Sequence, residues 1–258
     1  MDAAQIAQTL REAESTRTEL KPFSDDNPDI DLATAYDAQW LNVQAKLDSG
    51  DSVVGAKLGL TSRVKQKVMN VDDPLYGWVT SSMILEHDEP VDLSRFIHPR
   101  VEPEIGFLLG KDITTPANVA SVLASTEAVF AAIDVLDSRY ADFRFTLPDV
   151  AADNASAAGF YIGPKMVSPK NVDLGLVGAV FRVDGEVAAT AAGAATMGHP
   201  AAAVAWLANR LVQRGRKLEA GMIVFSGGLT APFPVTPGGS YSAELDGMGT
   251  IEIRGSAG

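Results

Sequence analysis

The chain has 258 residues, no Cys, and a formal net charge of −12, from 21 Lys and Arg against 33 Asp and Glu. This length fits one large domain, or a medium domain with a smaller second part, and either buries enough surface to fold without disulfide bonds. The lack of Cys excludes disulfide scaffolds, thiolate zinc sites and Cys nucleophiles, and the acidic balance argues against a nucleic-acid partner.

The amino terminus has neither the basic start nor the apolar run of a signal peptide. No stretch approaches the roughly 18 uninterrupted apolar residues that a membrane-spanning helix needs. A chain without Cys is also typical of a reducing interior. We therefore expect a cytoplasmic protein without a membrane partner.

The first 52 residues predict a helical region. Residues 3–20 and 32–48 are both expected to be helices, and the turn-rich segment 22–28 connects them. The second helix has apolar side chains at steps of three and four, namely Ala33, Tyr36, Trp40, Val43 and Leu47. We expect residues 1–52 to form an N-terminal helical region and residues 53–258 to form a β-rich domain.

From residue 53 onward the apolar residues form short runs between turn residues, which is the pattern of strands. The runs cover residues 53–60, 101–109, 130–136, 160–162, 177–183, 222–225, 241–245 and 250–253. Asp184-Gly185 and Asp246-Gly247 lie between alternating segments and predict hairpin turns. Antiparallel pairing is therefore favoured over a doubly wound parallel sheet.

Three segments among these runs predict helices, at residues 61–69, 117–129 and 200–213. Thr61 suits the N-cap of the first helix. The third has Pro200 in its first turn and Gly215 just beyond its end, where helices often stop. The Ala-rich stretch 187–208 predicts a strand end, a loop and the start of this third helix.

Glu102 and Glu104 lie two positions apart within the apolar run 101–109. On an extended chain their side chains project from one face, while Pro103 and the apolar neighbours project from the other. Their Cα atoms would be about 6.5–7 Å apart, so both carboxylates can converge on one cation. A solvated strand face is the alternative that this pair alone leaves open.

Asp134 lies inside the apolar run 130–136. A buried carboxylate needs an exposed strand end, an Arg partner or a metal ion, because its burial alone is costly. Together with Glu102 and Glu104 it would form an all-oxygen site, which suits Mg²⁺ or Mn²⁺ better than Zn²⁺. The three His residues show no metal-ligand spacing and are expected to be structural or exposed: His87, His98 and His199.

Lys57 lies in the apolar, Gly-flanked run 53–60. It either snorkels at a strand edge or directs its ammonium group at an anionic substrate, and the sequence leaves both interpretations open. Gly227 and Gly228 follow a later apolar strand. They would allow backbone N–H groups to approach a carboxylate closely, although a simple tight turn has the same composition.

Five motifs follow one another along the chain: Lys57-Leu58-Gly59-Leu60-Thr61-Ser62, Arg100-Val101-Glu102-Pro103-Glu104-Ile105, Asp134-Val135-Leu136-Asp137-Ser138-Arg139, Ala152-Asp153-Asn154-Ala155-Ser156 and Ser226-Gly227-Gly228-Leu229-Thr230. In this order and spacing they resemble the 2-keto-4-pentenoate hydratase / 4-oxalocrotonate decarboxylase family, within the fumarylacetoacetate hydrolase superfamily. The resemblance runs from about residue 53 to the last residue, and the helical N-terminal region is compatible with it.

The resemblance implies an α+β fold, a mixed and largely antiparallel β-roll of the fumarylacetoacetate hydrolase type, with an N-terminal helical layer before the catalytic domain. It implies Mg²⁺ or Mn²⁺ held by Glu102, Glu104 and Asp134, and a catalytic role for Lys57. The substrate would be a small 2-oxo or 2-hydroxy dienoic acid. The residues implied to bind this substrate are Leu60, Ser156, Gly227, Gly228 and Arg139.

Two branches of this family bind nearly the same dienoate. Arg63 and the loop 138–145 are more similar to the decarboxylase branch, and Ser81, which we place in the catalytic machinery, stands where the family usually has an acidic residue. Hydration needs a carboxylate to activate water, whereas decarboxylation needs chiefly an electron sink. We therefore expect decarboxylation of 2-oxo-3-hexenedioate (4-oxalocrotonate) to 2-hydroxy-2,4-pentadienoate, in the catabolism of aromatic-type compounds.

The alternative activity is that of a 2-hydroxypenta-2,4-dienoate (2-keto-4-pentenoate) hydratase, or of a related 2-oxo acid hydratase or hydrolase. A third interpretation is a non-catalytic 2-oxo acid-binding or partner subunit, but the retained carboxylates and Lys57 argue against it. The resemblance also implies a homo-oligomer and, for the decarboxylase branch, a complex with the hydratase that consumes its product.

Overall fold

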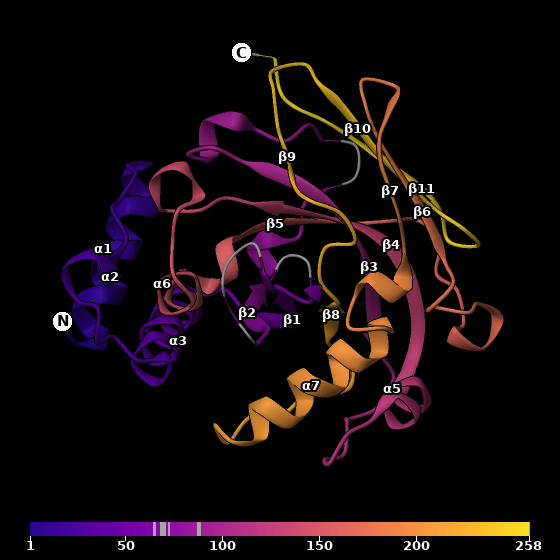
Figure 1. Ribbon diagram of the computed structural model, residues 1–258, viewed down its shortest axis with the longest axis horizontal. Coiled ribbons are helices and arrows are strands. Elements are labelled where there is room, and N and C mark those ends of the chain that lie inside the picture. The colour runs from indigo at the N-terminus through magenta and orange to yellow at the C-terminus, as the bar shows by residue number, and fades with distance from the viewer. Residues whose placement is uncertain (64–65, 68–70, 72, 87–88, 258) are drawn as a thin grey trace.

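The computed structural model describes residues 1–63, 66–67, 71, 73–86 and 89–257, and its helices lie mostly to one side of two β-sheets (Figure 1). The helices are α1 (Ala3–Thr16), α2 (Phe23–Asp26), α3 (Leu32–Asp48), α5 (Val119–Ser125), α6 (Leu147–Ala152) and α7 (Pro200–Val212). The strands are β1 (Val53–Gly59), β2 (Leu75–Thr80), β3 (Arg100–Leu109), β4 (Thr126–Leu136), β5 (Ala157–Ile162), β6 (Gly178–Val183), β7 (Glu186–Ala192), β8 (Ile223–Phe225), β9 (Phe233–Pro234), β10 (Ser240–Leu245) and β11 (Gly249–Arg254).

The larger sheet has the strand order β2-β1-β8-β3-β4-β5, and β9 pairs with β3. Only the β1–β8 pair of the described strands is parallel. The smaller sheet has the order β11-β10-β6-β7, and its strands β10 and β11 contact β4. The long strands β3 and β4 curve through the middle of the molecule (Figure 1). The predicted mixed, largely antiparallel β-roll is confirmed.

The N-terminal helices begin where side chains cap free backbone N–H groups. Asp2 accepts a hydrogen bond from the backbone N–H of Gln5 at 2.9 Å, and Asp31 accepts one from that of Thr34 at 2.7 Å. The first helix ends earlier than the predicted residue 20, because Arg17 adopts the left-handed conformation with φ 52°.

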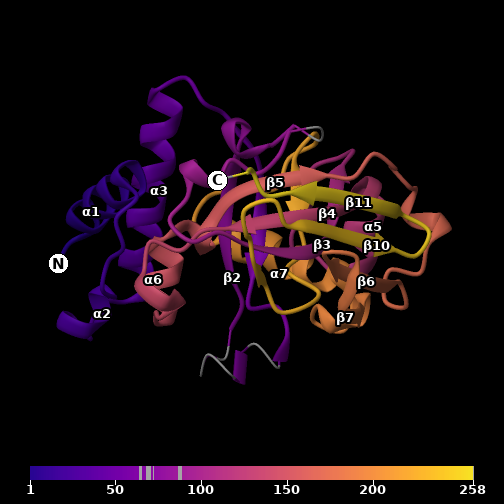
Figure 2. The same ribbon diagram turned by 90° about the horizontal axis from the view of Figure 1, so that it is seen from above.

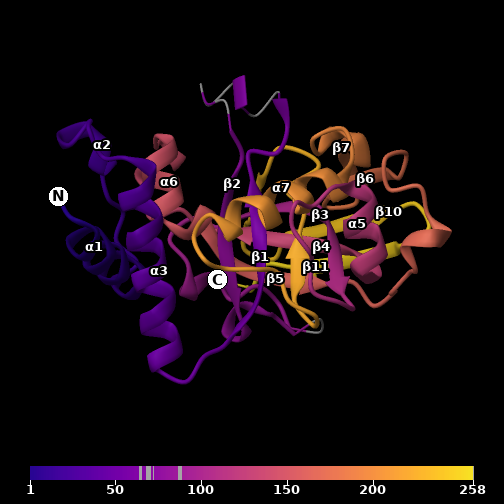
Figure 3. The ribbon, with the colours of Figure 1, turned by 90° about the horizontal axis from the view of Figure 1, so that it is seen from below.

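The helices α1, α2, α3 and α6 form one layer, on the side away from β6, β7, β10 and β11 (Figures 2 and 3). The helix α6 comes from the chain after β4, yet it packs against α3. The division of the chain at residue 52 stays a prediction.

The two hairpin turns confirm what the sequence predicts. Asp184-Gly185 joins β6 to β7 with Val183 opposite Glu186, and Asp246-Gly247 lies between β10 and β11. Gly185 has φ +85°, a conformation that glycine adopts without strain.

Several local predictions of secondary structure differ from the structure or lie outside its described residues. The predicted helix 117–129 is wrong in its second half, since α5 ends at Ser125 and Thr126 already belongs to β4. That segment becomes a strand because its side chains, including the fully buried Val129, pair with β3 and fill the core. The predicted strand runs do not include β2 or β9, and β7 was predicted only as a strand end after the turn at Asp184-Gly185. The predicted helix 61–69 lies partly outside the described residues.

Alternation along β3 places apolar and acidic side chains on opposite faces. Val101, Ile105 and Phe107 are fully buried in the main core, as the sequence predicts. Glu102 and Glu104 therefore face the other way. None of the described helices is long and apolar enough to cross a membrane.

Candidate metal centre

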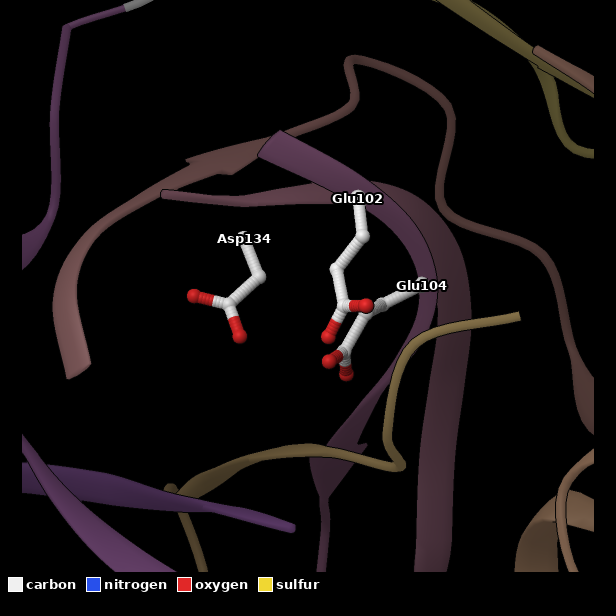
Figure 4. A group of neighbouring side chains, drawn as sticks. All are labelled: Glu102, Glu104 and Asp134. Carbon is white, nitrogen blue, oxygen red and sulfur yellow. The ribbon is translucent and has the colours of Figure 1, made fainter. Parts of the chain in front are cut away.

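Three carboxylates from β3 and β4 lie together in the interior. Glu102 and Asp134 are direct cross-strand partners, and Glu104 follows on the same face of β3. One oxygen from each of the three lies within 4.8 Å of the others, and the side chains point into a common space (Figure 4). Their exposed fractions are 5%, 0% and 0% for Glu102, Glu104 and Asp134. The structure thus brings together the residues predicted as metal ligands.

Lys57 reaches this cluster from β1. Its Nζ lies 2.5 Å from Oδ2 of Asp134 and donates a hydrogen bond to the carbonyl oxygen of Ala155 at 3.2 Å. The side chain is 1% exposed. The sequence left open whether Lys57 snorkels at a strand edge, and this burial beside a carboxylate rules that interpretation out.

Burial and neighbouring negative charge raise the proton affinity of Glu104, and the same negative charge raises that of Lys57. Burial raises the pKa of Glu104 well above its ordinary value, and the nearby charge of Asp134 raises it further. Burial acts to lower the pKa of Lys57, but Asp134, Glu104 and Glu102 together raise it. Negative charge therefore dominates this site.

The residues fit a divalent metal ion. Three carboxylates and the ammonium group of Lys57 sum to a formal charge of −3 + 1 = −2, which one divalent cation neutralises. The Oε1 atom of Glu104 is buried and has no hydrogen-bond partner among the described residues, so it is available as a ligand. Carboxylate oxygens are the donors that Mg²⁺ and Mn²⁺ prefer. Glu102, Glu104 and Asp134 would hold the ion.

The turn at Gly227 and Gly228 lies against two of these carboxylates. The backbone N–H of Gly227 donates to Oε2 of Glu104 at 2.8 Å. A Cβ atom on Gly228 would lie 2.1 Å from Cδ of Glu102, so a side chain at this position would displace the ligand. The turn therefore orients Glu102 and Glu104, and its contact with a substrate stays a prediction.

Ser156 and Leu60 lie around the Lys57 side of the centre. The hydroxyl of Ser156 is buried and has no hydrogen-bond partner among the described residues. Leu60 packs against the apolar cluster of Leu75, Val150 and Ala155, and the carbonyl of Ala155 accepts from Lys57. Both positions are compatible with the predicted substrate contacts, which stay predictions.

The sequence analysis did not propose Thr61 as a site residue. Its buried Oγ1 also has no hydrogen-bond partner among the residues described, and a Cβ on Gly227 would lie 2.2 Å from it. The sequence suggested Thr61 only as a helix cap. The signal that could have identified it as a site residue is its position just after the strand that carries Lys57.

Arg139 lies on the helical side of the molecule. Its buried guanidinium pairs with Asp153 and donates to the Asp153 carbonyl at 2.6 Å. Glu14 of α1 adds a further negative charge nearby. The structure does not place Arg139 among the residues that contact the three carboxylates, and its predicted substrate contact stays a prediction.

Ser81 lies beyond the end of β2, away from the carboxylate cluster. It is four residues past Gly77, the cross-strand partner of Lys57, or about 13 Å along a strand. Its exposed hydroxyl donates to Asp51 at 2.5 Å, and the hydroxyl of Ser82 donates to the same carboxylate at 2.6 Å. The structure does not bring Ser81 to the carboxylate cluster, and its catalytic role stays a prediction.

His98 and His199 follow the expectation that the His residues are structural or exposed. His199 caps α7, where its Nδ1 accepts from the backbone N–H of Ala201 at 3.1 Å. His98 pairs with Glu19 at 2.8 Å. His87 lies outside the described residues.

Known proteins resemble this chain along most of its length. The family model described as fumarylacetoacetate (FAA) hydrolase C-terminal matches residues 49–254. A 4-oxalocrotonate decarboxylase of Pseudomonas sp. (strain CF600) is 38% identical over 250 residues, which cover 96% of this chain and 95% of that protein. A 2-keto-4-pentenoate hydratase of Burkholderia vietnamiensis (strain G4 / LMG 22486) is 38% identical over 249 residues, with 96% and 95% covered.

A solved structure has nearly the same fold. The 4-oxalocrotonate decarboxylase from Pseudomonas putida G7, complexed with magnesium and adipate, superposes with a TM-score of 0.94 at 36% identity. The superposition covers 98% of this chain and 96% of the other. This neighbour holds magnesium, the type of ion that the three carboxylates described above fit.

Proposed function

We propose that this chain, which belongs to the fumarylacetoacetate hydrolase family, is a metal-dependent lyase that decarboxylates 2-oxo-3-hexenedioate to 2-hydroxy-2,4-pentadienoate and CO₂. Its relatives include decarboxylases and hydratases at similar identity, so similarity alone does not choose between the two reactions. The choice depends on the chemistry of the site.

The observation that carries the proposal is the composition of the buried centre. Three carboxylates converge with Lys57, and these carboxylates would form the ligand set of a metal ion. A hydratase needs a further base to activate water. Decarboxylation needs an acceptor for the electron pair that the departing CO₂ leaves behind, and a metal-bound 2-oxo group is such an acceptor.

A bound Mg²⁺ or Mn²⁺ would polarise the C2 ketone oxygen of the substrate as a Lewis acid. Lys57 would place its ammonium group near the same oxygen and stabilise negative charge there, because it is fixed between Asp134 and the carbonyl of Ala155. The buried hydroxyls of Ser156 and Thr61 would donate hydrogen bonds to the substrate carboxylate. Burial of these groups excludes water and strengthens each interaction.

Hydration of 2-hydroxy-2,4-pentadienoate is the second candidate, and one contact favours it. Ser81 and Ser82, which stand where the resemblance implies an acidic residue, both donate hydrogen bonds to the carboxylate of Asp51. That carboxylate could serve as a base if a substrate extended toward it. The distance of Ser81 from Lys57 along the strands makes this the weaker of the two candidates, and so do the hydrogen bonds that lower the pKa of Asp51 and make it a poor base.

Two substrates distinguish the candidates. Purified, Mg²⁺-loaded protein is offered 2-oxo-3-hexenedioate and, separately, 2-hydroxy-2,4-pentadienoate, while CO₂ release and the dienol absorbance are followed. CO₂ from the diacid alone supports the decarboxylase. Consumption of the dienol to a 4-hydroxy-2-oxo acid without CO₂ supports the hydratase, and no turnover of either substrate supports the binding-subunit interpretation.

We also propose that the chain forms homo-oligomers and associates with a hydratase that consumes its product. The edge strand β7 supports self-association, because both of its faces are largely exposed and it carries Val187 at 58% exposure. Light scattering of the purified protein at micromolar concentration tests self-association. A monomer mass for the wild type would contradict self-association, and a Val187→Lys variant should shift an oligomer toward monomer.

A further inference from the structure

We propose that Arg139 and Asp153 are positioning residues for Lys57. Their buried ion pair fixes the turn of residues 153–156, and the Ala155 carbonyl in that turn holds the ammonium group of Lys57. The inference deepens the proposed function, since the effect on turnover depends on the role of Lys57. Its structural part is independent of which reaction the protein catalyses.

Arg139 binds Asp153 at three points. Its Nε donates to Oδ1 of Asp153, its terminal nitrogen donates to the Asp153 carbonyl at 2.6 Å, and its backbone N–H donates to Oδ2 at 3.2 Å. The side chains are 6% and 1% exposed for Arg139 and Asp153. A guanidinium is suited to this role because its rigid fork of donors fixes both the position and the orientation of its partner.

The turn that follows Asp153 is strained. Asn154, Ala155 and Ser156 have φ values of 52°, 58° and 55°, so three consecutive non-glycine residues adopt the left-handed conformation. Each such residue costs on the order of 1 kcal/mol or more, and the conformation persists only where surrounding contacts impose it. The turn therefore depends on its anchors.

Two further anchors act on the other side of the turn. The side-chain amide of Asn154 accepts from the backbone N–H of Trp78 at 2.8 Å and donates to the Trp78 carbonyl at 2.9 Å. Gly77 leaves the space that this contact requires, because a Cβ there would lie 2.3 Å from the Asn154 carbonyl oxygen. Asn154 ties the turn to β2, and Arg139 ties it to the end of β4.

The turn delivers two groups to the metal centre. The Ala155 carbonyl accepts from Lys57 Nζ at 3.2 Å, and the hydroxyl of Ser156 is buried without a hydrogen-bond partner among the residues that the structure describes. Lys57 in turn pairs with Asp134. Loss of the Arg139 contact would let the turn relax, and both Lys57 and Ser156 would then lose their fixed positions.

The anchor also joins the N-terminal layer to the centre. The Arg139 carbonyl accepts from the backbone N–H of Leu20 at 2.8 Å, and Glu14 of α1 lies near the guanidinium. Lys46 of α3 pairs with Glu14 at 2.8 Å. The helical layer thus contributes to catalysis through the turn, without supplying a group that touches substrate.

Crystal structures of variants test the positioning directly, whatever the reaction. In Arg139→Gln and Asp153→Asn we expect the distance from Lys57 Nζ to the Ala155 carbonyl to exceed 4 Å. Tyr140→Phe is the matched control, because Tyr140 is a buried neighbour whose hydroxyl donates instead to the Asp149 carbonyl at 3.1 Å. An unchanged turn in both anchor variants would overturn the proposal.

A double-mutant cycle tests the consequence for turnover. We expect Arg139→Gln to lower kcat at least tenfold with KM changed less than threefold, and Arg139→Lys to restore part of the loss. In a Lys57→Met background the same Arg139→Gln change should lower kcat by a clearly smaller factor than in the wild type, because the contribution through Lys57 is already absent and only the contribution through Ser156 remains. A merely structural role would give equal losses in both backgrounds and would contradict the proposal.

Failure of the proposed function has a different signature. If the wild type releases no CO₂ from the diacid, the double-mutant cycle is run on whichever substrate it does turn over. If it turns over neither substrate, the crystal structures of the variants alone test the positioning. Should Arg139→Gln not fold, Arg139→Lys and Asp153→Asn carry the same comparison. The role of Arg139 would also be overturned if Tyr140→Phe lowered kcat as much as Arg139→Gln and Asp153→Asn do.

Discussion

Glu104 lies in an electrostatically unfavourable position in the candidate metal centre. It is fully buried, and burial with the charge of Asp134 raises its pKa well above the ordinary value. We expect Glu104→Gln to lower Mg²⁺ affinity by about 100-fold or more, since a ligand oxygen and its charge are both lost. Isothermal titration calorimetry measures this.

The same substitution should leave the metal-free fold intact. Removal of one of three crowded negative charges relieves repulsion, so the unfolding midpoint of metal-free Glu104→Gln should equal or exceed that of the wild type. Glu127→Gln, an exposed change on β4, is the control for both measurements. Wild-type Mg²⁺ affinity in Glu104→Gln would contradict the three-carboxylate site.

Asp51 gives a pH-dependent contribution to stability. Partial burial raises its pKa, but hydrogen bonds from Ser81 and Ser82 outweigh this and hold the pKa well below its usual range. A lowered pKa in the folded state stabilises the protein above the unfolded value of about 3.9, and the contribution is lost as pH falls below it.

We therefore expect the wild type to be more stable than Asp51→Asn at pH 6, with the difference shrinking toward pH 3. Urea unfolding at several pH values measures this, and Ser81→Ala should reduce the pH dependence. A constant difference between wild type and Asp51→Asn across this pH range would show that Asp51 is not held ionised by these contacts.

Single residues also show which features a sequence can predict. The alternation of apolar and acidic residues predicts that Glu102 and Glu104 share a face, because strand geometry depends only on local spacing. The partner of Arg139 is not predictable in this way. Asp153 comes from a turn after α6, and only the folded chain brings it to the end of β4.

The turn between β8 and β9 shapes the metal centre at the level of elements. A Cβ on Gly228 would lie 2.1 Å from the carboxylate carbon of Glu102, so we expect Gly228→Ala to displace this ligand and weaken Mg²⁺ binding at least tenfold. The matched control is Gly178→Ala, because a Cβ on Gly178 meets no atom within 4 Å. Equal Mg²⁺ affinity in both variants would contradict the close approach of this turn.

Element boundaries were predictable where local signals are strong. The start of α7 at Pro200 and the hairpin at Asp184-Gly185 each depend on only one or two residues, whose backbone conformational preferences are strong. The predicted helix 117–129 continued too far because Thr126 and the residues after it become a strand only by pairing with β3. Such long-range pairing overrides the local helical pattern.

A bound metal ion would stabilise the whole molecule. The site has a formal charge of −2 within a chain of net charge −12, and it exists only in the folded state, so a cation bound there would favour folding. At Mg²⁺ concentrations about 100-fold above Kd we expect an increase in Tm of about 5–10 °C. Differential scanning calorimetry with and without Mg²⁺ measures this, and Glu104→Gln should show almost no increase.

We propose above that the buried carboxylates and Lys57 form a metal-dependent decarboxylase centre. The most direct test is the rate of CO₂ release from 2-oxo-3-hexenedioate by the wild type, first after chelation, then after Mg²⁺ is restored, and in parallel by Glu104→Gln. We predict no release above the uncatalysed rate after chelation, full recovery with Mg²⁺, and no recovery in the variant. Equal CO₂ release by chelated and Mg²⁺-loaded protein would contradict the account.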